Sequence, residues 1–461
     1  MTQDTSGESR LQRRAFLGGA VGLVASALLA ACGGTAATPA AGGAAGGATT
    51  TGATAVPTTG GKRKTLLVWG RQQFLPESND HFTESAKLAG QKGGFDVNVQ
   101  LFTNEEHPQK EIVAMESGTV PDIAYTYAPA LWNQNGYALE VPDLYDTIGK
   151  TGGGWLPLAD PGSNVGGKRI GIPMNNEPWI LHLRKDLLEA AGVKLPLTSY
   201  DQLLDAFKKV NQADKNFFAF DGQMTEADWT GNCLQFLWAF GGRTVEADGT
   251  TIAINSPETL TALNWARDFW AAACLPDGLT WDDNGNNLAY ANGQIAATQN
   301  GPALYLNLRE GQGDLAALTA LAPFPVGPGG RGVPVTTHAH AIPAGATNAT
   351  IARAFLSWFG AREQTERYLA AAAGAVVAAL RGFADSPVWA ADPKLRAFLD
   401  AAETGRWIGW PAAPSRAATA ADANFVVVDM FAGVVAGDAP QAAITAAENA
   451  LRNLAALGAG A

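Results

Sequence analysis

Segments typical of strands and of helices alternate at the start of the folded region. Residues 64–70 form a short apolar run, and residues 96–101 alternate apolar and polar side chains as a strand does. Helix-like segments at 81–91 and 105–117 separate these runs from a third strand at 120–125. Strands and helices at this spacing predict a parallel or mixed sheet with helices on its faces. We therefore predict an α/β fold.

In such sheets ligands bind at the carboxyl ends of the strands. The loops that follow the first and third strands are therefore candidate walls of a binding site. Their side chains combine aromatic rings with hydrogen-bonding groups, and the candidates are Trp69, Arg71, Gln72, Tyr127 and Trp132. Further along the chain we predict helices at 199–211, 228–240, 257–274, 348–373, 392–404, 417–436 and 439–457, and a strand at 335–342.

The N-terminus has the features of an export signal. Arg13 and Arg14 precede an apolar run that is too short to span a bilayer, and the run ends in Leu-Ala-Ala-Cys32. The twin arginine resembles a Tat signal, and the last four residues resemble a lipobox whose cysteine is acylated. We predict a Tat-type lipoprotein signal at 1–32 and a flexible tether at 33–61, which contains no charged residue.

Composition limits the classes of function. The formal net charge of −11 argues against nucleic acid, which requires a basic surface. In an exported protein Cys233 and Cys274 could pair, and two buried thiols fit the apolar surroundings of both residues equally well. The 13 tryptophans suit apolar cores, and some also suit a site that stacks on the C–H faces of a sugar ring.

Six segments in order resemble the family 1 extracellular solute-binding proteins, the maltose-binding-protein-like group of ABC importers. They are residues 66–69, Glu-Ser-Gly-Thr-Val-Pro-Asp-Ile at 116–123, Gly-Lys-Arg-Ile-Gly-Ile-Pro at 167–173, the helix at 184–193, the segment from Gly293 to Pro302, and the helix at 352–359. One departure from the family is Ala303, which stands where the family often has a tryptophan after Asn-Gly-Pro; Tyr305 is the nearest ring.

The resemblance implies a two-lobed periplasmic-binding-protein-like fold with three hinge crossings near 173–177, 334–341 and 385–390. The first lobe is expected to combine 62–174 with 340–386, and the second 175–333 with 387–461. A ligand then lies in the cleft between the lobes, which close around it by hinge motion.

Several polar and aromatic residues lie at these crossings or in loops that face the cleft in the family. Glu177 matches the family's acidic residue at the first crossing, and a carboxylate can accept hydrogen bonds from two hydroxyls. The other candidates for ligand binding are Asn175, Asn176, Trp179, Trp229, Trp281, Tyr305, His338, Trp407 and Trp410.

His338 and His340 are two residues apart on a predicted strand, so they share one face. Two histidines could begin a metal site, but no third ligand has suitable spacing, and we expect them at the second crossing instead. We expect no metal and no cofactor.

We expect the chain to be no enzyme but a lipid-anchored protein on the outer face of the cytoplasmic membrane, which captures a carbohydrate and delivers it to ABC transporter permease subunits. One acid and one arginine among many amides and aromatics suit a neutral sugar. A polyamine, a peptide or another polar solute remains an alternative. An exported glycan hydrolase is a weaker one, because no pair of carboxylates stands out.

Overall fold

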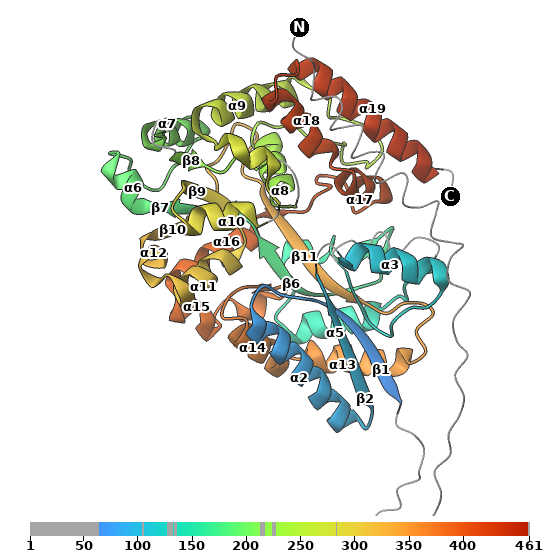
Figure 1. Ribbon diagram of the computed structural model, residues 1–461. Helices are drawn as coiled ribbons and strands as arrows, with labels where there is room; N and C mark the ends of the chain where they lie inside the picture. The colour runs from blue at the N-terminus through green and yellow to red at the C-terminus, as the bar shows by residue number, and fades with distance from the viewer. Residues whose placement is uncertain are drawn as a thin grey trace, which may run out of the picture. The chain divides into compact units, whose positions relative to one another are not determined.

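The computed structural model describes residues 64–103, 106–126, 132, 136–212, 217–223, 227–282 and 284–459 (Figure 1). These residues belong to one unit of the chain, Lys62–Ala461. The predicted signal and tether lie outside the described residues, as do Cys32 and Tyr127. Among the described residues, no helix is long and apolar enough to cross a membrane.

The predicted alternation of strands and helices at the start is confirmed. Strand β1 (Thr65–Arg71) pairs in parallel with β2 (Asp96–Phe102). Helix α2 (Pro76–Gly93) connects them, and α3 (Glu106–Ser117) leads to β3 (Ala124–Thr126). The carboxyl end of β1 carries Arg71, so this arrangement brings a charged side chain to the edge of the sheet.

Helix α2 begins at Pro76, several residues before its predicted start. Proline suits the first position of a helix, because an N–H at this position would find no acceptor inside the helix and its absence therefore costs no hydrogen bond. The helix ends at Gly93 and is capped by Gly94, whose φ of 75° lies in the left-handed region. The loop after β1 is therefore only four residues long, and it holds Gln72 and Phe74 close to the end of the strand.

Two long antiparallel strands form the centre of the structure (Figure 1). They are β6 (Ile172–Pro178) and β11 (Val333–Ala341), and their register places Glu177 opposite Thr336 and Asn175 opposite His338. Strand β3 pairs with β11 on one side, and β12 (Val377–Ala378) pairs with β6 on the other. Segments far apart in the sequence thus meet where the first two crossings were predicted.

A second sheet has the strand order β10-β7-β9-β8. Strand β7 (Ile180–Arg184) follows β6 directly and lies between β10 (Thr319–Ala322) and β9 (Ile295–Asn300), antiparallel to both. Strand β8 (Phe218–Phe220) runs parallel to β9. The carboxyl end of β9 carries Asn300, next to the start of the following helix.

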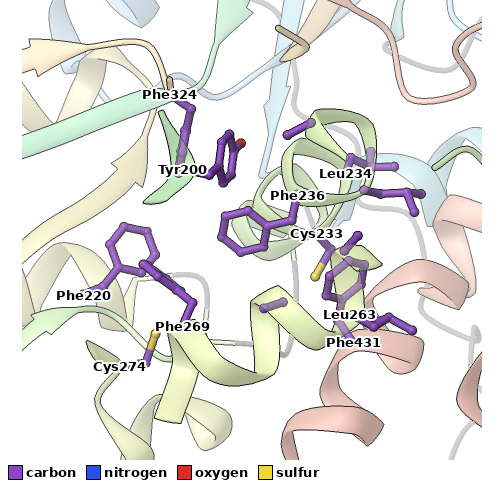
Figure 2. Packing of buried hydrophobic residues seen from close by; sticks show 14 of the residues in the cluster. Tyr200, Phe220, Cys233, Leu234, Phe236, Leu263, Phe269, Cys274, Phe324 and Phe431 are labelled. Carbon is purple, nitrogen blue, oxygen red and sulfur yellow. The ribbon is translucent and has the colours of Figure 1, made fainter. Parts of the chain in front are cut away.

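The fold is two-lobed, and its buried apolar residues form separate clusters. One cluster draws on residues 66–148, Ile172 and 342–383. Another draws on residues 181–297, Phe324 and 421–451, and Figure 2 shows its aromatic centre. Cys233 and Cys274 are both buried in this second cluster as free thiols, which decides between the two alternatives for them. The exact lobe boundaries stay a prediction.

Two of the predicted helices are divided. The segment 348–373 forms α13 (Ala349–Phe359) and α14 (Arg362–Ala371), with Gly360 between them. The segment 417–436 forms α17 (Arg416–Ala423) and α18 (Val426–Val435), because Phe425 adopts a left-handed conformation with a φ of 53°. The apolar periodicity continues through both breaks, so it could not reveal them.

The other elements follow the predictions closely where predictions were made. They are α5 (Pro142–Thr151), β4 (Asn164–Val165), β5 (Lys168–Arg169), α6 (Lys185–Ala190), α7 (Tyr200–Val210), α8 (Ala227–Ala239), α9 (Pro257–Ala273), α10 (Gly285–Ala291), α11 (Pro302–Gly311), α12 (Gly313–Leu318), α15 (Pro387–Ala391), α16 (Arg396–Glu403), β13 (Gly405–Arg406) and α19 (Pro440–Ala459).

Candidate functional site

A cavity of about 340 Å³ opens beside the central strands. Arg71 and Phe74 line it from the end of β1 and the loop that follows. Glu177 and Trp179 line it from the end of β6 and the residue before β7. The remaining lining residues come from the end of β9 and from α10, α11 and their ends, namely Asn284, Asn287, Leu288, Ala291, Asn300, Gly301, Ala303, Leu304, Asn307, Leu308, Gly311 and Gln312.

Arg71 and Glu177 form a buried ion pair at one end of this cavity. Their Nη1 and Oε2 atoms are 2.6 Å apart, and the two side chains are only 5% and 12% exposed. Burial alone would raise the pKa of Glu177, but the charge of Arg71 and the contact with His338 outweigh it and hold that pKa well below its usual value. Burial alone would lower the pKa of Arg71, but the negative charge of Glu177 outweighs burial and raises the pKa of the guanidinium. Both groups are therefore ionised, and their charges cancel.

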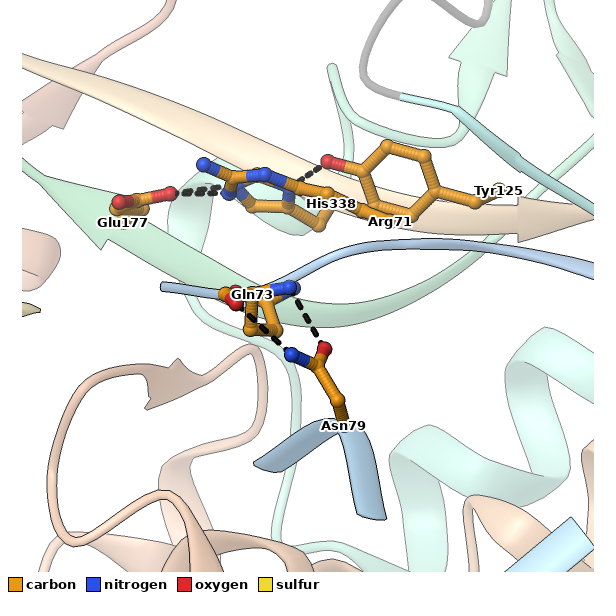
Figure 3. A network of polar contacts seen from close by, with 6 residues as sticks. All are labelled: Arg71, Gln73, Asn79, Tyr125, Glu177 and His338. Carbon is orange, nitrogen blue, oxygen red and sulfur yellow. Dashed lines mark hydrogen bonds and ion pairs between the residues drawn. The ribbon is translucent and has the colours of Figure 1, made fainter. Parts of the chain in front are cut away.

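His338 also contacts the Glu177 carboxylate (Figure 3). Its Nε2 lies 3.1 Å from Glu177 Oε2, and its Nδ1 contacts the hydroxyl of Tyr125. Burial lowers the pKa of His338, so the imidazole is neutral at pH 7. These contacts fit one tautomer, in which Nε2–H donates to Glu177 and Nδ1 accepts from Tyr125. The result is a chain of contacts from β3 through β11 to β6.

The loop that carries Phe74 is fixed by a pair of hydrogen bonds, also drawn in Figure 3. The backbone N–H of Gln73 donates to Asn79 Oδ1 at 2.7 Å, and Asn79 Nδ2 donates to the carbonyl oxygen of Gln73 at 2.9 Å. Phe74 itself is 53% exposed, and the Arg71 guanidinium carbon lies 5.6 Å from its ring centroid. An exposed ring held at the wall of a cavity can stack on an apolar face of a ligand.

Uncharged amides and apolar side chains line the rest of the cavity. Asn300 is largely buried, and its Nδ2 donates to Asn287 Oδ1 at 2.6 Å. Gly301, between β9 and α11, allows Glu177 to approach closely, since a Cβ at this position would lie 3.0 Å from Glu177 Oε1. Among the described lining residues, Arg71 and Glu177 are the only charged ones.

The structure brings several predicted site residues together. Arg71, Glu177 and Trp179 line the cavity, and His338 contacts Glu177 without being one of the described lining residues. Asn175 and Asn176 are buried in β6 next to Glu177, and Asn176 Oδ1 accepts a hydrogen bond from Thr337 at 2.8 Å. For all of these predicted site residues, a role in ligand binding stays a prediction.

Other predicted site residues do not line this cavity. Two of them are buried, four are half-buried, and Gln72 is exposed. The hydroxyl of Tyr305 donates to Asp392 at 2.8 Å, so this ring does not replace the tryptophan expected near Ala303. Trp410 packs on Trp238 and beneath the guanidinium of Arg406. The residues placed away from this cavity are Trp69, Gln72, Trp132, Trp281, Tyr305, Trp407 and Trp410.

Two predicted site residues remain without a side-chain description. Trp229 lies within α8, but the structure does not describe its side chain, and Tyr127 lies outside the described residues. Trp238, also in α8, is buried, with only 1% of its surface exposed. His338 and His340 both contact the ring of Tyr125 beside the second crossing. In the described part of the chain, no group of three or more His, Cys, Asp or Glu side chains could hold a metal ion.

Sequence reasoning missed Phe74 and all five amides among the described lining residues. One signal was available for the amides, because residues 284–307 contain six asparagines, at 284, 286, 287, 292, 300 and 307. Asn284 and Asn287 are one helical turn apart, and so are Ala303 and Asn307. For Phe74, the sequence shows only a lone ring in a polar loop.

Comparisons with known proteins agree with this architecture. A family model described as "Bacterial extracellular solute-binding protein" matches residues 82–397. A probable ABC transporter-binding protein of Deinococcus radiodurans is 24% identical over 182 residues, which is 38% of this chain and 43% of that protein. The chain thus matches less than half the length of this relative.

Solved structures show the same fold. A solute-binding protein of Thermotoga lettingae, solved with bound α-D-tagatose, superposes with a TM-score of 0.73 at 21% identity, covering 85% of this chain and all of that one. The GacH receptor of Streptomyces glaucescens, solved unliganded and with acarbose, gives a TM-score of 0.73 at 20% identity, covering 86% and 99%. With the family model spanning more than half of its length, this chain belongs to the bacterial extracellular solute-binding proteins.

Proposed function

We propose that this protein captures a neutral carbohydrate in the cavity at the central strands and delivers it to the permease of an ABC transporter. The observation that carries this proposal is the charge arrangement of the cavity. Its described lining has one cation and one anion, which are bonded to each other, and otherwise amides and apolar side chains. Amides both donate and accept hydrogen bonds, as sugar hydroxyls require.

The alternatives fit this lining less well. A polyamine requires several free carboxylates, whereas Glu177 is the only one among the described lining residues and is already paired with Arg71. An anionic solute requires a free cation, and Arg71 is neutralised by the same pair. Glycoside hydrolysis commonly uses two carboxyl groups that flank the scissile bond, and the described lining of this cavity contains one. Binding without chemistry is the simplest role for such a site.

The relatives support the same class of ligand. The Thermotoga lettingae protein was solved with α-D-tagatose and the Streptomyces glaucescens receptor with acarbose. The Deinococcus radiodurans relative is described as a probable ABC transporter-binding protein. Hence we propose transporter delivery as well as sugar capture.

A thermal-shift screen tests the ligand class. Neutral sugars should raise the unfolding midpoint in a concentration-dependent way, because a ligand that binds only the folded state stabilises it. Spermidine, a tripeptide and a uronic acid should leave the midpoint unchanged. The shift should shrink in Glu177→Gln but not in Glu363→Gln, whose carboxylate is 67% exposed and lies in α14. A shift with spermidine or the tripeptide alone would contradict the carbohydrate proposal.

We also propose that export and acylation of Cys32 attach the protein to the outer face of the cytoplasmic membrane, through the predicted tether at 33–61. Cys32→Ser should release the exported protein from the membrane fraction after cell lysis. Arg13→Lys combined with Arg14→Lys should instead retain it in the cytoplasm. A Cys32→Ser protein that still fractionates with membranes would contradict lipid attachment.

A further inference from the structure

The cavity extends well beyond the Arg71–Glu177 pair. Ala303, Asn307 and Gly311 line it at intervals of four residues, which places them on one face of α11. Leu304, Leu308 and Gln312 line it from the adjacent positions. Three successive turns of this helix therefore border the cavity. We call this part of the cavity the α11 groove.

The α11 groove is longer than one sugar unit. A helix rises about 1.5 Å per residue, so the distance from Ala303 to Gly311 along the axis is about 12 Å, which exceeds the width of a single pyranose ring. The groove begins at Gly301, where Glu177 Oε1 lies close to the helix start. It therefore leads away from the charged pair, and a ligand unit held at that pair has space beyond it.

The described walls of the α11 groove consist of small residues, amides and apolar side chains. Ala303 and Gly311 leave space because their side chains are small or absent. Asn307 and Gln312 are exposed amides, and Leu288 on α10 presents an apolar side chain that is 54% exposed. No charged side chain is among the described lining residues of α10 and α11. Hydroxyls can bind the amides while C–H faces pack on the leucine.

We infer that the α11 groove is an extension subsite, and that the ligand is a linear neutral oligosaccharide of two or more units rather than a monosaccharide. This inference rests on the proposed function, since it assumes that the ligand is a sugar. One unit lies at the Arg71–Glu177 pair, and the next units lie along α11. The groove is long, and its described lining carries no charge. We therefore expect affinity to depend on the number of sugar units rather than on an acidic or basic substituent.

The chain offers a matched pair of variants to test the extension subsite. A Cβ at Gly311 would meet no atom within 4 Å, so the side chain of Gly311→Trp starts from open space and places a ring at the far end of the groove. Gly313 is equally open but does not line the cavity, so Gly313→Trp is the control. Neither glycine has a positive φ, so neither substitution strains the backbone.

The measurement is calorimetric titration with glucose, maltose and maltotriose, and in parallel with laminaribiose and cellobiose. In the unchanged protein at least one oligosaccharide should bind about tenfold more tightly than glucose, because a second unit adds hydrogen bonds. Gly311→Trp should reduce the ratio of oligosaccharide to glucose affinity, and Gly313→Trp should retain it.

The outcomes separate the two proposals. Equal affinity for glucose and every oligosaccharide, or an unchanged ratio in Gly311→Trp, overturns the extension subsite but leaves sugar capture standing. Binding of none of these sugars, together with no shift from any neutral sugar in the thermal-shift screen, overturns the proposed function and this inference with it. A ratio that falls in Gly311→Trp alone establishes that the ligand runs along α11.

Discussion

The two ends of the cavity differ in burial and in how far their side chains are bonded to other parts of the protein. At one end, Arg71, Glu177 and His338 are buried and bonded to one another, and they come from three different strands. At the other end, Asn307, Gly311 and Gln312 belong to α11 and its end and are exposed. Interactions within the protein hold the first end in place before a ligand arrives, whereas the second end mainly provides space. We therefore expect changes at the charged end to alter folding stability, and changes in the α11 groove to alter binding alone.

The largest expected effect comes from breaking the ion pair. Glu177→Gln leaves the buried guanidinium of Arg71 without its counter-charge, and loss of one partner of a buried pair costs about 3–5 kcal/mol of unfolding free energy. Urea denaturation at pH 7 measures this change. The control is Glu363→Gln, which breaks the exposed pair with Arg367 and should cost about 0–1 kcal/mol.

A double variant sharpens the same test. Arg71→Met combined with Glu177→Gln removes both charges, and it should be more stable than Glu177→Gln alone. If Glu177→Gln costs no more than the surface control, then the pair is not held in a buried environment and the contrast between the two ends fails.

The sequence predicted Arg71 and Glu177 at the charged end, but it predicted none of the residues that line the α11 groove. Glu177 was identified because it lies at a family crossing, and Arg71 because it follows the first strand. By contrast, five of the tryptophans proposed for the site lie outside the cavity and are buried or half-buried, because burial of a large apolar ring stabilises a core as well as a site. They are Trp69, Trp132, Trp281, Trp407 and Trp410. Nothing in the sequence distinguished the two uses of the same residue.

The fold shows the same division between local pattern and tertiary contact. Alternation and helical periodicity predicted the order of elements from β1 onward. They missed the break at Phe425, because a phenylalanine rarely adopts a positive φ and the apolar pattern continues across it. Likewise, the space along α11 depends on which segments lie opposite Ala303 and Gly311, and only the folded structure defines that.

A second prediction concerns acid sensitivity beneath the charged end. His340 stacks on Phe82 with a centroid distance of 5.8 Å, and burial lowers its pKa to about 3. Its pKa in the unfolded chain is about 6.5, so the unfolded state binds the proton more readily. The stability associated with neutral His340 is fully present above pH 6.5 and is lost as the pH falls towards 3. Between pH 7 and pH 5 the loss should be about 2 kcal/mol.

His340→Gln isolates this contribution, because glutamine does not titrate. Urea denaturation at pH 7 and at pH 5 should show a smaller loss of stability on acidification in the variant than in the unchanged protein. The difference between the two losses, rather than either value, reports on His340, since other buried groups titrate in both proteins. Equal losses would mean that His340 is accessible to protons in the folded state.

A third prediction moves to the exposed aromatic wall. Phe74→Ala removes a ring that is 53% exposed, so the unfolding free energy should change by no more than about 0.5 kcal/mol. Sugar affinity should fall by about 1 kcal/mol, or roughly fivefold, because an apolar face of the ligand loses its contact. Calorimetric titration with the best sugar of the thermal-shift screen measures it. Val113→Ala on α3, at a 63% exposed position outside the cavity, should leave affinity unchanged.

The smallest expected effect is at Asn307, within the α11 groove. Asn307→Ala removes an exposed amide from a helix, and alanine is the better helix former, so stability should stay the same or rise by a few tenths of a kcal/mol. Affinity for an oligosaccharide should fall by about 0.5–1.5 kcal/mol, the contribution of one hydrogen bond between neutral groups. Glu310→Ala is the matched control, since Glu310 is exposed on the same helix but does not line the cavity. If both variants weaken binding equally, α11 acts through its general stability rather than through the groove. A loss confined to Asn307→Ala, without a loss of stability, would show that this end of the cavity contributes to binding without contributing to folding.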